Sequence, residues 1–80
     1  MEKEIINKLH TTKLGEERIK RNLYLGDIDT VDYCKKIICD SKCSIASKGK
    51  NWYCQKDNIL ITVNRSSYTI ITANLLKKNN

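Results

Sequence analysis

The hydrophobic positions follow a helical spacing in the first half of the chain and an alternating spacing in the second half. Up to residue 39, apolar side chains recur every three or four positions, which is typical of helices that bury one face. From residue 43 onward they alternate with polar side chains and are rich in β-branched types, which is typical of strands. This order predicts an α+β fold whose helices and strands occupy separate halves of the chain.

Three segments have the helical spacing. A short one covers residues 4–9, and two longer ones cover residues 13–23 and 30–39. Thr11 and Thr12 offer N-cap hydroxyls to the second segment, where acidic residues precede basic ones, as the helix dipole favours. We expect the two longer helices to cover one face of a sheet.

The second half predicts four strands, at residues 43–47, 51–56, 59–64 and 68–73. The turns between them contain only two or three residues, so neighbouring strands must be antiparallel. We therefore expect two N-terminal helices packed on one face of a four-stranded antiparallel meander sheet. Residues 1–80 are predicted to form a single small domain, with a helical turn over about residues 1–10 and a tail over residues 74–80.

The length limits what the domain can contain. A chain of 80 residues buries only about 60% of the surface that it exposes when unfolded, which leaves one thin core. A deep cofactor pocket is not expected in such a core, and no cofactor is predicted. No segment has the roughly 18 consecutive apolar residues of a membrane span, and the start MEKEIINKLH lacks the apolar run of a signal peptide. These features predict a cytoplasmic protein that makes no membrane contact.

The four cysteines are predicted to be reduced thiols with structural roles, because nothing marks the chain for export. Cys34, Cys39, Cys43 and Cys54 give the spacings C-x4-C, C-x3-C and C-x10-C. None of these is the CxxC pair that presents two thiolates to one ion. The sequence therefore predicts no metal site.

The net charge of +6 comes entirely from the second half of the chain. Residues 1–40 contain eight Lys/Arg and eight Asp/Glu, whereas residues 41–80 contain seven Lys/Arg and one acidic residue, Asp57. A sheet that is apolar on one face and cationic on the other is a natural surface for a polyanion, so we expect contact with RNA or another nucleic acid. A basic domain without such a partner explains the composition equally well.

The segment KGKNWY places two lysines around a flexible glycine and follows them with two aromatic residues. Lysines in a turn can track phosphates, and an exposed aromatic ring can stack on a base. Only one of Trp52 and Tyr53 can lie outside, because neighbouring strand residues face opposite sides, and a core position for Trp52 is the simpler interpretation. The predicted nucleic-acid contacts are Lys48, Lys50, Trp52, Lys56, Arg65 and Ser67.

His10 is the only histidine and the only side chain that readily exchanges protons near neutral pH. Cleavage of RNA through its 2′-hydroxyl needs a base, an acid and a cation at the phosphate. His10 and Arg18 are the predicted centre of such a site. If Ile71 belongs to the core, Tyr68 and Thr72 emerge on the cationic face and line it. A structural role explains a lone histidine more simply.

The segments LHTTKLGEERIKRNL, KGKNWY, ILITVN and SYTIITA resemble a family of short bacterial proteins of unknown function. The similarity covers about residues 9–73, and it implies a fold without implying an activity. A looser similarity connects the order of elements with the compact nuclease and toxin fold. RelE-type ribosome-dependent ribonucleases, barnase, EndoU enzymes and colicin-D-type tRNA nucleases share that fold.

The looser similarity implies roles for particular residues. His10 and Arg18 match polar residues on the first helix of such domains, and the last hairpin is matched by Arg65, Ser67 and Thr72. These relatives often have a histidine directly after the Thr-Ala pair, where this chain has an asparagine. If that histidine moves the proton, the similarity implies RNA binding without cleavage.

Two classes of function follow. In the first, the chain is a small metal-independent ribonuclease or toxin that binds and cleaves RNA. In the second, it is a non-catalytic module or inhibitor whose basic sheet docks on nucleic acid, on an antitoxin, or on an acidic or nucleoprotein partner. In either class, an exposed strand edge at residues 43–47 or 68–73 can pair with a second copy to form a homodimer.

Overall fold

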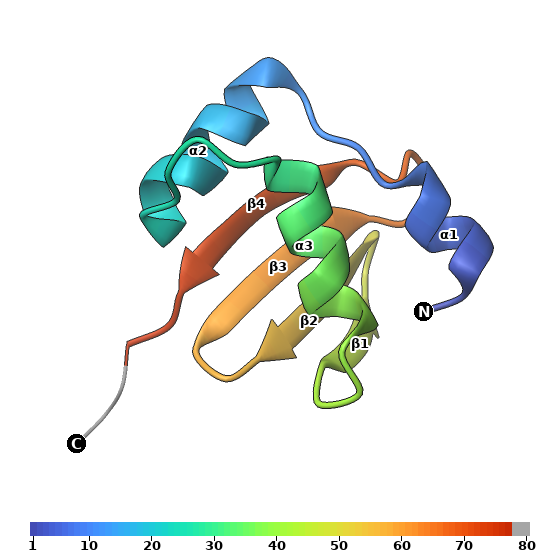
Figure 1. Cartoon of the computed structure of the whole chain (residues 1–80). Coiled ribbons are helices and arrows are strands. Elements are labelled where there is room, and N and C mark those ends of the chain that lie inside the picture. Colours follow the sequence, from blue (N-terminus) through green and yellow to red (C-terminus); the bar gives the residue numbers. More distant parts are fainter. Residues whose placement is uncertain (78–80) are drawn as a thin grey trace.

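The computed structural model describes residues 1–77 and confirms the predicted α+β fold (Figure 1). Three helices precede a four-stranded antiparallel meander with the strand order β1-β2-β3-β4. The helices are α1 (Lys3–Lys8), α2 (Lys13–Leu23) and α3 (Thr30–Cys39). The strands are β1 (Ser44–Lys48), β2 (Asn51–Lys56), β3 (Ile59–Asn64) and β4 (Ile70–Leu75).

Side-chain caps fix where the two longer helices begin. The Thr12 hydroxyl accepts a hydrogen bond from the backbone N–H of Gly15 at 3.0 Å, and the Asp29 carboxylate accepts one from Asp32 at 3.0 Å. These bonds satisfy amide groups that have no partner within the helix. The second helix ends at Leu23, and the residue that caps it, Tyr24, has a left-handed backbone with φ of 56°.

The core lies between the helices and one face of the sheet. α2 packs against β4 and α3 packs against β2. The register Cys54↔Ile61↔Ala73 aligns three fully buried side chains across β2, β3 and β4, and Ile19 of α2 belongs to the same buried cluster. We call this side of the sheet the helix side and the opposite side the open face.

The alternation predicted for residues 68–73 is wrong at one place, because β4 contains a bulge. Thr62 pairs with Thr72 but Val63 pairs with Ile70, so Ile71 is the extra residue. Ile70 is buried, whereas Ile71 is 39% exposed and is not a core residue. The strand extends to Leu75, two residues past its predicted end. The last part of the predicted tail, residues 78–80, lies outside the described residues.

The segment between α1 and α2 runs along the outer edge of β4. The backbone N–H of His10 donates to the carbonyl of Tyr68 at 3.2 Å, and that of Ile70 donates to the carbonyl of His10 at 2.7 Å. The Thr11 hydroxyl also donates to the Ile70 carbonyl, at 2.8 Å. Gly15 makes this close approach possible, because a Cβ atom at that position would overlap the Thr11 hydroxyl.

We found no helix in residues 1–77 with both the length and the apolar character that a membrane crossing requires.

Candidate nucleic-acid interface

The basic residues among positions 41–77 lie in turns, at strand ends or just beyond them, and not across the sheet. The register and the strand alternation give the open face these side chains: Ser44, Ala46, Lys48, Asn51, Tyr53, Gln55, Leu60, Thr62, Asn64, Thr72 and Asn74. Lys48 is the only charged one among them. The prediction of a cationic sheet face is therefore wrong. Turns keep long charged side chains solvated, and the cations gather there instead of in the middle of strands.

Lys56 illustrates this correction. It lies at the end of β2 on the helix side, two residues along from the buried Cys54. Its ammonium group forms an ion pair with the Asp40 carboxylate at 3.0 Å, and this hydrogen-bonded contact raises the pKa of Lys56. Lys56 is therefore paired with Asp40, at the opposite end of the sheet from the other residues predicted to contact nucleic acid.

Lys48, Lys50 and Arg65 do come together at one end of the sheet, which we call the cationic end. The β1–β2 turn and the β3–β4 turn adjoin there, because alternate turns of a meander lie at the same end. The backbone N–H of Arg65 donates to the Lys50 carbonyl at 2.9 Å. The Arg65 guanidinium donates to the hydroxyl of Ser47. Three exposed cations thus project from two hydrogen-bonded turns.

A shallow hollow of about 630 Å³ opens on the sheet beside this end. It is lined by Lys48, Gly49, Lys50, Asn51, Tyr53 and Leu60. Tyr53 and Leu60 give the hollow an aromatic and an aliphatic surface on two inner strands. The hollow therefore combines ammonium groups with a ring that is accessible from the open face.

Trp52 lies on the helix side and not in this hollow. Its ring stacks with that of Tyr68, with centroids 6.2 Å apart and planes inclined by 20°. The ammonium group of Lys8 lies 5.5 Å from the centroid of the Tyr68 ring. Of the two adjacent aromatic residues in β2, Tyr53 is therefore the one on the open face, and Trp52 packs against the core.

His10 is joined to the β3–β4 turn by a chain of side-chain hydrogen bonds. Its Nδ1 lies 2.9 Å from the Lys8 carbonyl and its Nε2 lies 3.1 Å from the Thr69 hydroxyl. A carbonyl can only accept, so Nδ1 donates to it. The Thr69 hydroxyl lies 2.8 Å from that of Ser67, and the Ser67 hydroxyl donates to the side-chain carbonyl of Asn64 at 3.2 Å.

The remaining predicted catalytic residues do not join this chain. Tyr68 is half-buried on the helix side, whereas Thr72 pairs with Thr62 on the open face. The expectation that both emerge on one face fails because it required a buried Ile71, and the bulge exposes that residue. Arg18 is exposed on α2, and it makes no ion pair or side-chain hydrogen bond with another residue of the described chain.

Sequence reasoning missed Tyr53, Thr69 and Lys8 as members of these groups. Strand alternation contained the signal for Tyr53, since assigning Trp52 to the core leaves its neighbour outside. No sequence signal was available for Thr69, which meets His10 across 59 positions of the chain. Such a contact depends on the path of the chain beside β4.

The cysteines differ in their burial and chemistry. Cys34 and Cys54 are completely buried, and this burial raises the pKa of each thiol to about 12. Burial, and then the Asp40 carboxylate, also raise the pKa of Cys43, while Cys39 is exposed. All four are free thiols, and within residues 1–77 no group of three or more His, Cys, Asp or Glu side chains is arranged to hold a metal ion.

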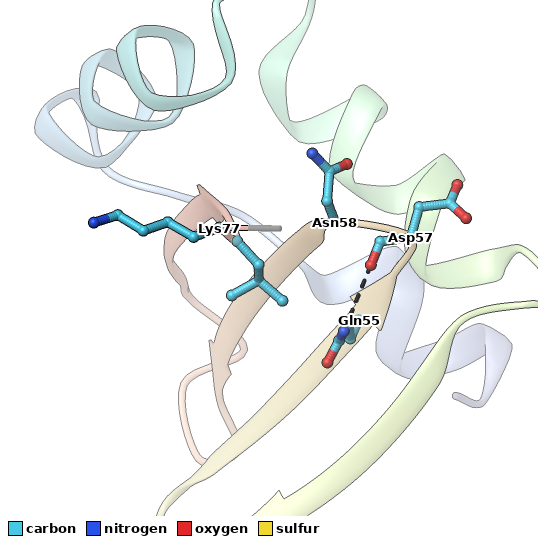
Figure 2. A pocket seen from close by; sticks show the side chains of 5 residues that line it. Gln55, Asp57, Asn58 and Lys77 are labelled. Atoms are coloured by element: carbon cyan, nitrogen blue, oxygen red, sulfur yellow. Dashed lines mark hydrogen bonds between the residues drawn. The ribbon is translucent and has the colours of Figure 1, made fainter. Parts of the chain in front are cut away.

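A second hollow lies at the far end of the sheet, beside the β2–β3 turn. Figure 2 shows its lining, which comprises Gln55, Asp57, Asn58, Leu76 and Lys77. The Gln55 amide donates to the Asp57 carbonyl at 3.5 Å, and the backbone N–H of Leu76 donates to the Asn58 carbonyl at 2.6 Å. None of the predicted site residues contributes to it, and its mixed lining provides no set of groups for catalysis.

Comparison with known proteins identifies the family. No curated protein and no solved structure gives a significant match, so the looser similarity to the nuclease and toxin fold gains no support. A family model described as "Protein of unknown function (DUF3781)" matches residues 3–74. The match runs from the first residue of α1 to the penultimate residue of β4. The chain therefore belongs to this family, DUF3781.

Proposed function

We propose that this protein binds single-stranded RNA on the open face of its sheet, at the cationic end. The observation that supports this most is the hollow in which Lys48 and Lys50 adjoin the Tyr53 ring. Single-strand binding needs cations for the phosphates and an aromatic platform for a base. Both requirements are met within one hollow of a small sheet.

Each lining residue has a role in the proposal. Lys48 and Lys50 contact successive phosphates, and Arg65 in the adjoining turn adds a third charge at the end of the sheet, where its guanidinium donates to Ser47 on the helix side. Tyr53 stacks on a base. The hollow is shallow and open to solvent, which suits bases that are unstacked and splayed out more than it suits a duplex.

The test is the fluorescence anisotropy of a labelled eight-nucleotide RNA, titrated with protein at several salt concentrations. For a single strand, log affinity falls by about 0.7 per log unit of salt for each phosphate neutralised. If Lys48, Lys50 and Arg65 each neutralise one phosphate, a plot of log affinity against log salt concentration should have a slope of about −2. A slope near zero would exclude RNA as the ligand of this surface.

Matched variants separate the site from the overall charge. The double variant Lys48→Gln/Lys50→Gln should reduce the slope by about 1.4. The control Lys13→Gln/Lys35→Gln removes the same charge from the helices and should leave the slope nearly unchanged. Equal effects of the two would mean that only the net charge of the protein matters.

Substitutions of Tyr53 test the proposed stacking of a base on its ring. Tyr53→Ala should weaken binding by about five- to 150-fold, since a base stacked on an aromatic ring contributes about 1–3 kcal/mol. Tyr53→Phe keeps the ring and should retain most of the affinity. Loss of affinity in both would assign the effect to the Tyr53 hydroxyl instead of to stacking.

Cleavage of the bound RNA is a second candidate, and one observation favours it. The hydrogen-bond chain from His10 through Thr69 to Ser67 joins an imidazole to two hydroxyls in and beside the turn that holds Arg65. End-labelled RNA incubated with the protein in EDTA tests this. Cleavage that disappears in His10→Ala but persists in Arg18→Ala would support it, and intact RNA with the unaltered protein would reject it.

A further inference from the structure

Within residues 1–77, the outer edge of β1 is unpaired along its whole length. All five residues of Ser44–Lys48 are exposed, and β2 pairs with them on one side only. Among residues 1–77, the backbone of β1 makes no hydrogen bond outside that ladder except a weak one at 3.9 Å from the Cys43 thiol to the Ser44 carbonyl. An unpaired edge of this kind offers a row of N–H and C=O groups to another extended chain.

A hollow of mixed lining adjoins this edge on the helix side. It measures about 610 Å³, and Ile6, Ile38, Cys43 and Ile45 form an apolar part of a lining that also includes Lys3, Asn7 and Asp40. Ile45 pairs with the buried Cys54 but is itself 37% exposed. A strand added to β1 would place every second side chain on the helix side, beside Ile45 and this hollow. The hollow therefore fits a branched apolar side chain of such a strand.

The charges around the edge indicate what kind of strand fits. Lys42 precedes β1, while Lys48 and Lys50 lie at its end, and all three are exposed. Asp40, the acidic residue nearest to the edge in the sequence, is already paired with Lys56. An incoming segment that contains carboxylates would pair with these exposed ammonium groups.

The same charges oppose pairing with a second copy. Antiparallel self-pairing centred on Ile45 sets Lys42 opposite Lys48, and pairing centred on Ala46 sets Lys42 opposite Lys50. Either arrangement contains two such like-charge contacts, which destabilise a cross-strand pair. Each chain also has a net charge of +6.

We propose that the β1 edge binds an extended acidic segment of a partner protein, which adds to the sheet as a fifth strand. The segment alternates carboxylate side chains with branched apolar ones that enter the hollow beside Ile45. Because Lys48 and Lys50 belong to both surfaces, a bound segment would also compete with RNA. That competition rests on the proposed function, whereas the docking itself does not.

The probe is an eight-residue peptide that alternates glutamate and valine, titrated into isotopically labelled protein and followed by the amide NMR signals. We expect saturable shifts concentrated at Ser44–Lys48 and at least tenfold weaker binding when lysine replaces glutamate. A version with methylated central amide nitrogens keeps the charge but cannot form the ladder, and it should not bind. Equal binding by that version would overturn the proposal, because charge alone would then explain the contact.

Two protein variants make the test specific. Ile45→Ser should weaken binding severalfold, whereas Ile28→Ser, which removes an isoleucine of similar exposure from the loop before α3, should not. Shifts confined to Lys48 and Lys50 would overturn strand addition. Sedimentation at twice the 9.3 kDa chain mass, with loss of peptide binding, would assign the edge to a second copy and overturn the proposal as well. None of these outcomes depends on whether RNA binds.

Discussion

The two edges of the sheet differ in how their backbone groups are satisfied. The β4 edge is covered by the His10 segment, by the Thr11 hydroxyl on the Ile70 carbonyl, and by the Asn22 amide on the Ala73 carbonyl at 3.2 Å. The β1 edge has no equivalent cover within the described residues. At the β4 edge, a few polar side chains and a close approach allowed by one glycine satisfy the backbone groups. At the β1 edge, the like charges of lysines near the strand ends oppose pairing with a second copy.

The largest effect is expected from Gly15→Ala, which disturbs the covered edge. The added methyl group would overlap the Thr11 hydroxyl and come within van der Waals distance of the Ile70 carbonyl. The Thr11 hydroxyl and the Ile70 carbonyl are hydrogen-bonded to each other at the β4 edge, so relief of the overlap breaks this bond or shifts the segment before α2. We expect a loss of about 1–3 kcal/mol in the free energy of unfolding, measured by urea denaturation.

Gly26→Ala is the matched control. A methyl group added at that position would meet no other part of the chain within 4 Å beyond its immediate neighbours, and the φ of Gly26 is not in the left-handed region. The substitution should therefore be neutral or stabilising by about 0.4–1 kcal/mol, because it restricts the unfolded chain. If Gly15→Ala were as harmless as Gly26→Ala, the close approach of Thr11 to α2 would be wrong.

A smaller effect is expected from Asn22→Ala. The Asn22 amide group donates to the Ala73 carbonyl and to the Asn74 side chain, at 3.2 and 2.9 Å. Removing these bonds should cost about 1 kcal/mol, the usual net value of a partly buried hydrogen bond. Ser44→Ala on the free edge should change the unfolding free energy by less than about 0.5 kcal/mol. Similar losses of unfolding free energy in Asn22→Ala and Ser44→Ala would show that the two edges do not differ in this way.

The sequence predicted the elements well because short-range patterns determine them. Strands β2 and β3 begin and end where the alternation and the turn residues place them, and α2 and α3 match their predicted spans. The bulge at Ile71 could not be predicted in this way. β-branched residues on both sides of it fit either face, and only pairing with β3 decides which is buried.

The candidate site was less predictable than the fold. Lys48, Lys50 and Arg65 come together because turn lengths alone specify the meander, and the sequence contains that information. Lys56 was assigned to the same surface by counting charge, although alternation places it with Cys54 on the helix side. The contact of His10 with Thr69 requires the path between two helices, and no local pattern encodes that path.

The smallest effect concerns the ion pair behind the free edge. Asp40 and Lys56 hold the loop that leads into β1. The backbone N–H of Lys42, and then the Lys56 ammonium group, hold the pKa of Asp40 below its ordinary value of 3.8. A carboxyl group with a lowered folded-state pKa stabilises the fold above its unfolded pKa, and this contribution disappears as the pH falls through the folded value.

Asp40→Asn should therefore be less stable than the unaltered protein near neutral pH, and the difference should narrow as the pH falls below about 4. Because the pair is accessible to solvent, the difference should be small and should shrink with added salt. Asp27→Asn removes an exposed acid that makes no ion pair or side-chain hydrogen bond in residues 1–77, and serves as the control. Urea denaturation at several pH values measures both variants. If the unfolding free energies of Asp40→Asn and the unaltered protein differed by the same amount down to acid pH, the ion pair would not be the cause. The loop before β1 would then be held in place by packing.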